Sequence, residues 1–154
     1  MKTHYISTET LTFEQVNRII TEHYQLALSE DAKQRIQKCR DYLDKKMENQ
    51  TVPIYGVTTG FGSLCNVNIS KEDLSTLQKN LVMSHACGTG DLVPEEIIRI
   101  MLLLKIQNMS YGNSGVQLVT VQRLIDFFNN DVLPVVYDLG SLGASGDLAP
   151  LANL

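Results

Sequence analysis

The segment GSLGASGDLAP, residues 140–150, contains three neighbouring residue types that can react with one another without an external reagent. The amide nitrogen of Gly146 is not hindered by a side chain, and in a sharply bent backbone it can attack the carbonyl carbon of Ala144. Loss of one water from the new ring, and of the Ser145 hydroxyl as a second, leaves a methylidene imidazolone. This group is a strong electrophile, and the flanking glycines can take the φ values that such a bend requires.

The same residues also fit a simpler structural interpretation. Ser145 or Asp147 could cap a helix, with Pro150 in its first turn, and the tripeptide taken alone favours this alternative. A nucleophile elbow is not predicted, because its G-x-S-x-G pattern needs glycine where Asp147 stands. A serine hydrolase that uses Ser145 as nucleophile is a further alternative, which labelling by a fluorophosphonate would support.

The composition limits the classes of partner. The chain has 154 residues and a net charge of −4, from 13 Lys and Arg against 17 Asp and Glu. Nucleic-acid and anionic membrane surfaces need clustered basic residues, so this balance argues against both. The longest apolar run, 97–106, is interrupted by two basic residues and is shorter than the ~20 residues that span a bilayer.

The cysteines and histidines of the chain are Cys39, Cys65, Cys87, His4, His23 and His85. They show no metal-ligand spacing, which favours reduced thiols in a cytosolic protein.

Apolar residues at helical spacing predict a mainly α-helical chain. Thr12 and Gln15 resemble a capping box, and Ser29 is a plausible N-cap. Residues before 13 are expected to be extended, and 131–140 to be short and non-helical. Residues 150–154 are typical of the first turn of an apolar helix, so we expect the chain to be the N-terminal part of a larger protein. The predicted helices run over about 13–28, 30–48, 70–84, 94–110 and 114–129.

Glycine-rich segments separate several of these helices. Residues 50–68 form a predicted loop of nearly 20 residues, and loops of that length are usually functional or disordered. The apolar and aromatic side chains of this segment favour the functional alternative. Two further glycine-rich segments, 84–91 and 110–115, are predicted to end or interrupt helices.

Four segments together resemble the aromatic amino acid ammonia-lyases, the family that acts on histidine, phenylalanine or tyrosine. GSLGASGDLAPLA is similar to the family's prosthetic-group signature and YGVTTGFG (55–62) to its tyrosine loop. NLVMSHACGTG (80–90) is similar to its substrate-selectivity segment, and IRIMLLLKIQNMSYGNSGVQ (98–117) to the helix before its Gly-x-Ser-Gly break. The resemblance implies that residues 1–154 are the N-terminal, apparently truncated portion of the fumarase/aspartase-like α-helical lyase fold, with glycine-rich active-site loops.

The resemblance also implies a role for each matching residue. Ala144, Ser145 and Gly146 would form 4-methylidene-imidazol-5-one (MIO) autocatalytically, with no external cofactor and no metal. Tyr55 would be the base that removes the β-proton of the substrate, with an ordinary loop aromatic residue as the alternative. Gly60 would place backbone near the substrate. Asp147 would brace the strained loop.

The pair Ser84-His85 stands at the family's selectivity position. There the phenylalanine enzymes usually carry Phe-Leu, the tyrosine enzymes His-Leu and the histidine enzymes Ser-His. A polar pair suits an imidazole, because a site that hydrogen-bonds its ligand discriminates strongly against apolar analogues. The resemblance thus implies elimination of ammonia from L-histidine to give trans-urocanate, in histidine degradation, by a cytoplasmic homotetramer with active sites shared between subunits.

Other functions stay open. The chain could belong to a phenylalanine or tyrosine ammonia-lyase, or to an aminomutase on the same scaffold. It could also be a catalytically incomplete fragment with only an assembly role, because the family's full chain is several times longer and its later part supplies further site residues. Lys105, Gln107 and Asn153 stand where many members have Arg, Asn and His.

Overall fold

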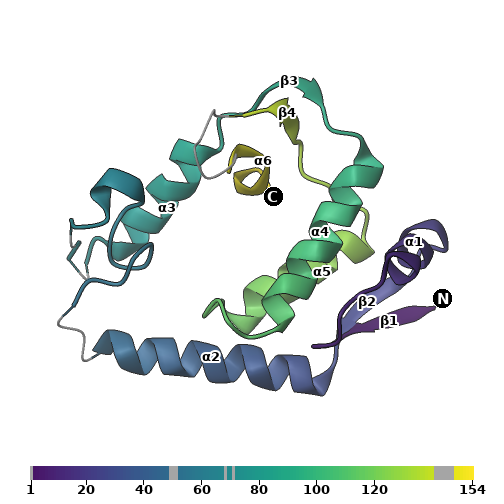
Figure 1. Ribbon diagram of the computed structural model, residues 1–154, viewed down its shortest axis with the longest axis horizontal. Coiled ribbons are helices and arrows are strands. Elements are labelled where there is room, and N and C mark those ends of the chain that lie inside the picture. The colour runs from purple at the N-terminus through teal and green to yellow at the C-terminus, as the bar shows by residue number, and fades with distance from the viewer. Residues whose placement is uncertain (1, 49–51, 68, 71, 141–147) are drawn as a thin grey trace. The chain divides into compact units, whose positions relative to one another are not determined.

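The computed structural model describes the chain in five stretches, and helices dominate it (Figure 1). The stretches are 2–48, 52–67, 69–70, 72–140 and 148–154. Two compact units divide the chain, the first formed by 1–48 with 94–134 and the second by 49–93 with 135–154. The prediction of a mainly α-helical chain is confirmed. Within the described stretches, no helix has the length and apolar character needed to cross a membrane.

The first unit packs four helices against a pair of parallel strands. In this pair Thr3 lies opposite Gln25, and Ile6 lies opposite Leu28. α4 contacts every helix of the unit, and it lies side by side with α5 (Figure 1). The elements are β1 (Thr3–Ile6), α1 (Phe13–Thr21), β2 (Gln25–Leu28), α2 (Glu30–Glu48), α4 (Glu95–Ser110) and α5 (Leu118–Asn129).

The helix predicted over 13–28 is wrong beyond Thr21. His23 takes a left-handed φ of 49°, which a continuing helix cannot accommodate. After it, Leu26 and Leu28 are buried while their neighbours are half-buried, so burial has the period of a strand. The start of the helix is as predicted, because Thr12 and Gln15 form both hydrogen bonds of a capping box.

α4 is buried along one face. Its core residues include Leu102, Leu103 and Ile106, each 0% exposed. Ile97 and Leu104 are about half exposed, so the helix is not covered on all sides as predicted from its apolar composition. At its end the buried Gln107 amide donates to the backbone carbonyls of residues 7 and 9, at 2.9 and 3.0 Å.

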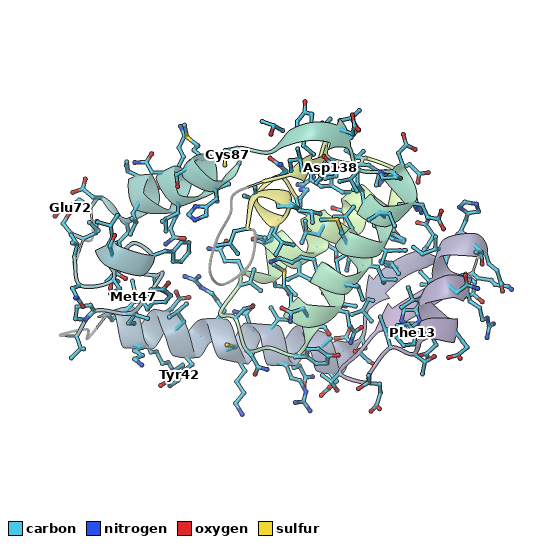
Figure 2. The ribbon with its side chains drawn as sticks, turned by 45° about the horizontal axis from the view of Figure 1, so that its top comes forward. Phe13, Tyr42, Met47, Glu72, Cys87 and Asp138 are labelled. Carbon is cyan, nitrogen blue, oxygen red and sulfur yellow. The ribbon has the colours of Figure 1, made fainter. Side chains whose placement is uncertain are left out.

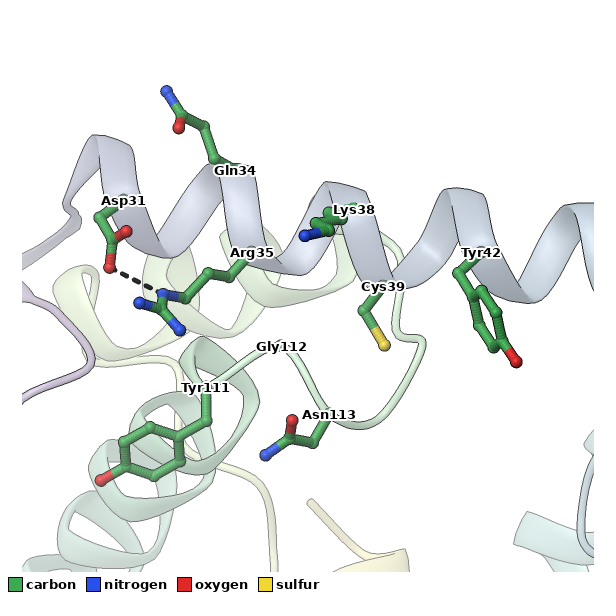
Figure 3. Close-up of a pocket in the computed structure, with 9 residues that line it drawn as sticks. All are labelled: Asp31, Gln34, Arg35, Lys38, Cys39, Tyr42, Tyr111, Gly112 and Asn113. Carbon is green, nitrogen blue, oxygen red and sulfur yellow. Dashed lines mark hydrogen bonds and ion pairs between the residues drawn. The ribbon is translucent and has the colours of Figure 1, made fainter.

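The turn between α4 and α5 depends on two glycines that approach α2. Gly112 has φ 70°, and a Cβ added there would lie 2.7 Å from the backbone carbonyl of Arg35. Gly115 has φ 67°, and a Cβ there would meet the Leu43 side chain at 2.6 Å. Figure 3 shows Gly112 beside α2, where Arg35 pairs with Asp31 at 3.0 Å. The predicted break at 110–115 is confirmed.

The second unit joins a long loop, one helix, a pair of short strands and a final helical turn. β3 and β4 are antiparallel, and α6 packs against α3. The sequence did not predict β3. The helix α3 begins four residues later than predicted, because the Ser70 hydroxyl donates to the Asp73 carboxylate at 2.8 Å instead of capping a helix. Its elements are the 3-10 turn η1 (Gly62–Leu64), α3 (Leu74–His85), β3 (Thr89–Leu92), β4 (Tyr137–Leu139) and α6 (Ala149–Ala152).

All three cysteines are free thiols. Cys39 and Cys65 are half-buried, and Cys87, which follows α3, is exposed (Figure 2). Within the described ranges, no group of three or more His, Cys, Asp or Glu side chains is arranged to hold a metal ion.

Replacing the two turn glycines by alanine tests the close approach to α2. Both variants force alanine into left-handed φ, which costs about 1–2 kcal/mol. Gly115→Ala meets only the movable end of the Leu43 side chain, whereas Gly112→Ala meets rigid helix backbone. In urea denaturation we expect Gly112→Ala to lower the free energy of unfolding by at least about 3 kcal/mol and Gly115→Ala by clearly less. Equal losses would contradict this account of the turn.

Candidate active site

The loop from Tyr55 to Gly62, here called the tyrosine loop, is held from within by two threonines. Thr58 and Thr59 are 3% and 0% exposed. The Thr58 hydroxyl accepts from the backbone N–H of Ile54 at 2.9 Å, and the Thr59 hydroxyl accepts from that of Gly56 at 3.3 Å. Because these side chains satisfy the backbone of a segment without regular structure, the loop has a defined conformation.

Gln78 fixes the tyrosine loop to α3. Its amide nitrogen donates to the carbonyls of Gly56 and Val57, at 3.1 and 3.3 Å. One side chain on the helix therefore holds two consecutive peptide units of the loop, directly after Tyr55.

Phe61 joins the tyrosine loop to the end of α3. Its ring centroid lies 5.7 Å from that of Tyr55 and 5.5 Å from that of His85, which it meets at 82° in an edge-to-face contact. The Tyr55 hydroxyl accepts from the backbone N–H of Gly62 at 3.4 Å. Gly56, with φ 69°, makes room for this packing, because a Cβ there would lie 2.7 Å from the Phe61 ring. Tyr55 and His85 thus contact the same ring.

Ser84 and His85 lie in the last turn of α3, where backbone carbonyls lack helical partners. The Ser84 hydroxyl donates to the carbonyl of Leu81 at 2.9 Å. The Nδ1 atom of His85 lies 2.8 Å from the same carbonyl oxygen and 3.1 Å from the Ser84 hydroxyl. Gly60 lies in the loop, where a Cβ would lie 2.8 Å from the Leu64 Cβ.

The predicted electrophile residues Ala144, Ser145 and Gly146, together with Asp147, lie outside the described residues. The elements on both sides of them are described. The chain enters this segment from β4 and leaves it into α6, which packs on the helix that carries Ser84 and His85. The four predicted site residues that are described, namely Tyr55, Gly60, Ser84 and His85, all belong to the second unit.

A buried donor lies on the segment that follows α6. The amide nitrogen of Asn153 is buried and has no hydrogen-bond partner among the described residues. It lies close to Gly88, where an added Cβ would be 3.2 Å away. Because buried donors in folded proteins almost always have a partner, this amide calls for an acceptor oxygen.

Two residues of this arrangement were not predicted as functional from the sequence. Gln78 and Phe61 have no side-chain chemistry that marks them as catalytic. Gln78 precedes His85 by two helical turns, so helical periodicity places both on one face. That spacing is the signal that could have pointed to Gln78.

A groove of about 610 Å³ in the first unit contains none of the predicted site residues (Figure 3). It lies between α2 and residues 111–113, and its charged lining includes Asp31, Arg35 and Lys38. Since Asp31 and Arg35 already pair with each other, nothing in the groove indicates a ligand.

Comparison with known proteins places the chain in a family. Residues 11–154 match the family described as aromatic amino acid lyase. A histidine ammonia-lyase of Caldanaerobacter subterraneus subsp. tengcongensis is 47% identical over 154 residues, which cover all of this chain and 30% of that protein. The chain belongs to the aromatic amino acid lyase family, as the four segments predicted, and it spans about 30% of the length of this curated relative.

Solved structures agree with this assignment. A tyrosine aminomutase from Streptomyces globisporus superposes with a TM-score of 0.88 at 34% identity, covering 97% of this chain and 28% of that one. A histidine ammonia-lyase from Trypanosoma cruzi gives 0.83 at 30% identity, covering 100% and 28%. These neighbours have the all-α lyase fold, which confirms the predicted fold class, and members of the family in general depend on MIO.

Replacing Gln78 by leucine tests the attachment of the tyrosine loop. Two hydrogen bonds to the loop are lost, at a cost of about 1–2 kcal/mol. We expect the amides of Val57 and Thr58 to exchange with deuterium about tenfold faster. Gln122→Leu, which removes an exposed glutamine of α5, is the control and should leave these amides unchanged. Unchanged exchange in Gln78→Leu would contradict the attachment.

Proposed function

We propose that the protein carrying this chain eliminates ammonia from L-histidine to give trans-urocanate, without oxidation. The observation that carries the proposal is the contact of Phe61 with both Tyr55 and His85. It puts a tyrosine, whose ionised oxygen can accept a proton, beside a polar residue that can recognise an imidazole. The 47% identity to a protein named histidine ammonia-lyase supports the same substrate.

In this proposal Ala144, Ser145 and Gly146 form MIO. The segment that follows α6 offers one donor that suits such a group. The buried amide of Asn153 needs an acceptor oxygen, and the imidazolone ring carries a carbonyl oxygen. When formed, MIO supplies an electrophile that makes the amino nitrogen of the substrate a better leaving group.

The remaining steps belong to ordinary side chains. The Tyr55 oxygen, which the Gly62 N–H holds in place, removes the β-proton of the substrate. His85 binds the substrate ring, with Ser84 beside it. Gly60 keeps a side chain away from the loop backbone that faces the substrate, and Asp147 braces the backbone next to MIO.

The chain spans 30% of the length of its curated relative. We propose that residues 1–154 are the N-terminal, MIO-bearing portion of a longer protein and that the later part supplies the other site residues. We further propose that the protein is a cytoplasmic homotetramer that takes L-histidine as its small-molecule substrate and binds neither nucleic acid nor membrane.

A comparison of substrates tests the proposed reaction. The full-length protein is offered L-histidine, L-phenylalanine and L-tyrosine, and products are separated by chromatography. We expect urocanate to form with a kcat/KM at least about a hundredfold above that for L-phenylalanine, because the apolar ring leaves polar groups of the site unpaired. Faster turnover of either other substrate would contradict the proposal, and a β-amino acid product would identify an aminomutase.

Replacing Tyr55 by phenylalanine tests the base. The variant keeps the ring against Phe61 and removes only the hydroxyl. We expect kcat to fall by about 10²–10⁴. Tyr42→Phe is the matched control, since Tyr42 is 65% exposed where Tyr55 is 62% exposed, and its activity should equal that of the parent. If Tyr55→Phe retained full kcat, another group would be the base.

A further inference from the structure

The hydrogen bonds of His85 determine which of its ring nitrogens carries the proton. The Leu81 carbonyl oxygen, 2.8 Å from Nδ1, can only accept a hydrogen bond. Nδ1 must therefore be the protonated nitrogen, because an unprotonated Nδ1 at that distance would place two lone pairs against each other.

Ser84 supports the same assignment. Its hydroxyl proton is already directed to the Leu81 carbonyl at 2.9 Å. Its oxygen therefore faces His85 Nδ1, 3.1 Å away, as a second acceptor. Both neighbours of Nδ1 accept, so both favour the Nδ1–H form of the ring.

The other ring nitrogen is left as an acceptor. In a neutral imidazole with a proton on Nδ1, Nε2 carries a lone pair. Nε2 has no hydrogen-bond partner within the part of the chain that the structure describes. The edge-to-face contact with Phe61, at 82°, fixes the plane of the ring and so the direction of this lone pair.

We propose that Leu81, Ser84 and Phe61 form a clamp that presents His85 Nε2 as a hydrogen-bond acceptor to the substrate ring. This inference rests on the proposed function and narrows its substrate class to amino acids whose ring carries a hydrogen-bond donor. Ser84 is then a positioning residue, which acts through His85 and does not touch the substrate.

The clamp predicts a particular order of substrates. L-histidine has a ring N–H in either tautomer and can donate to Nε2. L-phenylalanine has no donor, whereas the phenol of L-tyrosine has one, so this contact rejects phenylalanine more strongly than tyrosine. The informative probe is β-(4-thiazolyl)-L-alanine, whose five-membered ring has an acceptor nitrogen but no N–H.

The first test reads the tautomer directly. Nitrogen-15 NMR of the protein labelled at histidine distinguishes protonated from unprotonated ring nitrogens, and the signals lost in His85→Gln identify His85. At a pH where His85 is neutral, we expect Nδ1 to be protonated and Nε2 to be unprotonated. The reverse assignment would overturn the clamp whatever the activity of the protein.

The second test uses the two amides that mimic the ring nitrogens. In His85→Gln the amide reaches the position of Nε2, and in His85→Asn it reaches only that of Nδ1. We expect the parent to prefer L-histidine to the thiazole by about a hundredfold in kcat/KM. His85→Gln should keep most of this preference, whereas His85→Asn should lose it.

Ser84 provides the third test. Ser84→Ala should raise KM for L-histidine about fivefold with little change in kcat, as expected for one lost orienting hydrogen bond. Ser84→Thr, which restores a hydroxyl, should rescue KM. A parent protein without activity on L-histidine would refute the proposed function, whereas equal preferences in His85→Gln and His85→Asn in an active protein would refute the clamp alone.

Discussion

The contact of the Phe61 ring with Tyr55 and His85 is the interaction on which the arrangement of the second unit depends. It connects an irregular loop to the end of a helix, and among the described residues no backbone hydrogen bond joins the two. Gln78 adds a polar attachment from the same helix. Together these contacts give the tyrosine loop a position relative to α3 that its backbone alone would not have.

Most of the helices could be predicted from the sequence, because an amphipathic stripe and a cap are local features. The capping box at Thr12 and the N-cap at Ser29 are both formed. The first of two errors has a non-local cause. Residues 25–28 form a strand because they pair with 3–6, and an apolar periodicity cannot show a partner 22 residues away along the chain. The second error, the late start of α3, has a local cause, because the Ser70 hydroxyl bonds to the Asp73 side chain and does not cap the helix.

The candidate site was predictable in its residue types but not in its geometry. Tyr55, Ser84 and His85 were singled out because their segments resemble those of one family, and the family assignment is confirmed. Their mutual placement depends on Phe61 and Gln78, whose roles come only from tertiary contact. The tautomer of His85 likewise follows from the Leu81 carbonyl, a backbone group that every residue type possesses.

The central claim is that Ala144-Ser145-Gly146 becomes an electrophile, and the mass of the purified full-length protein tests it most directly. The account predicts a mass lower than that of the sequence by two water molecules, with the loss mapped to the peptide that contains residues 144–146. Ser145→Ala should show no such loss. An unmodified serine at 145 in a protein that releases ammonia from L-histidine would contradict the account, because the elimination would then proceed without the group that the sequence was expected to make.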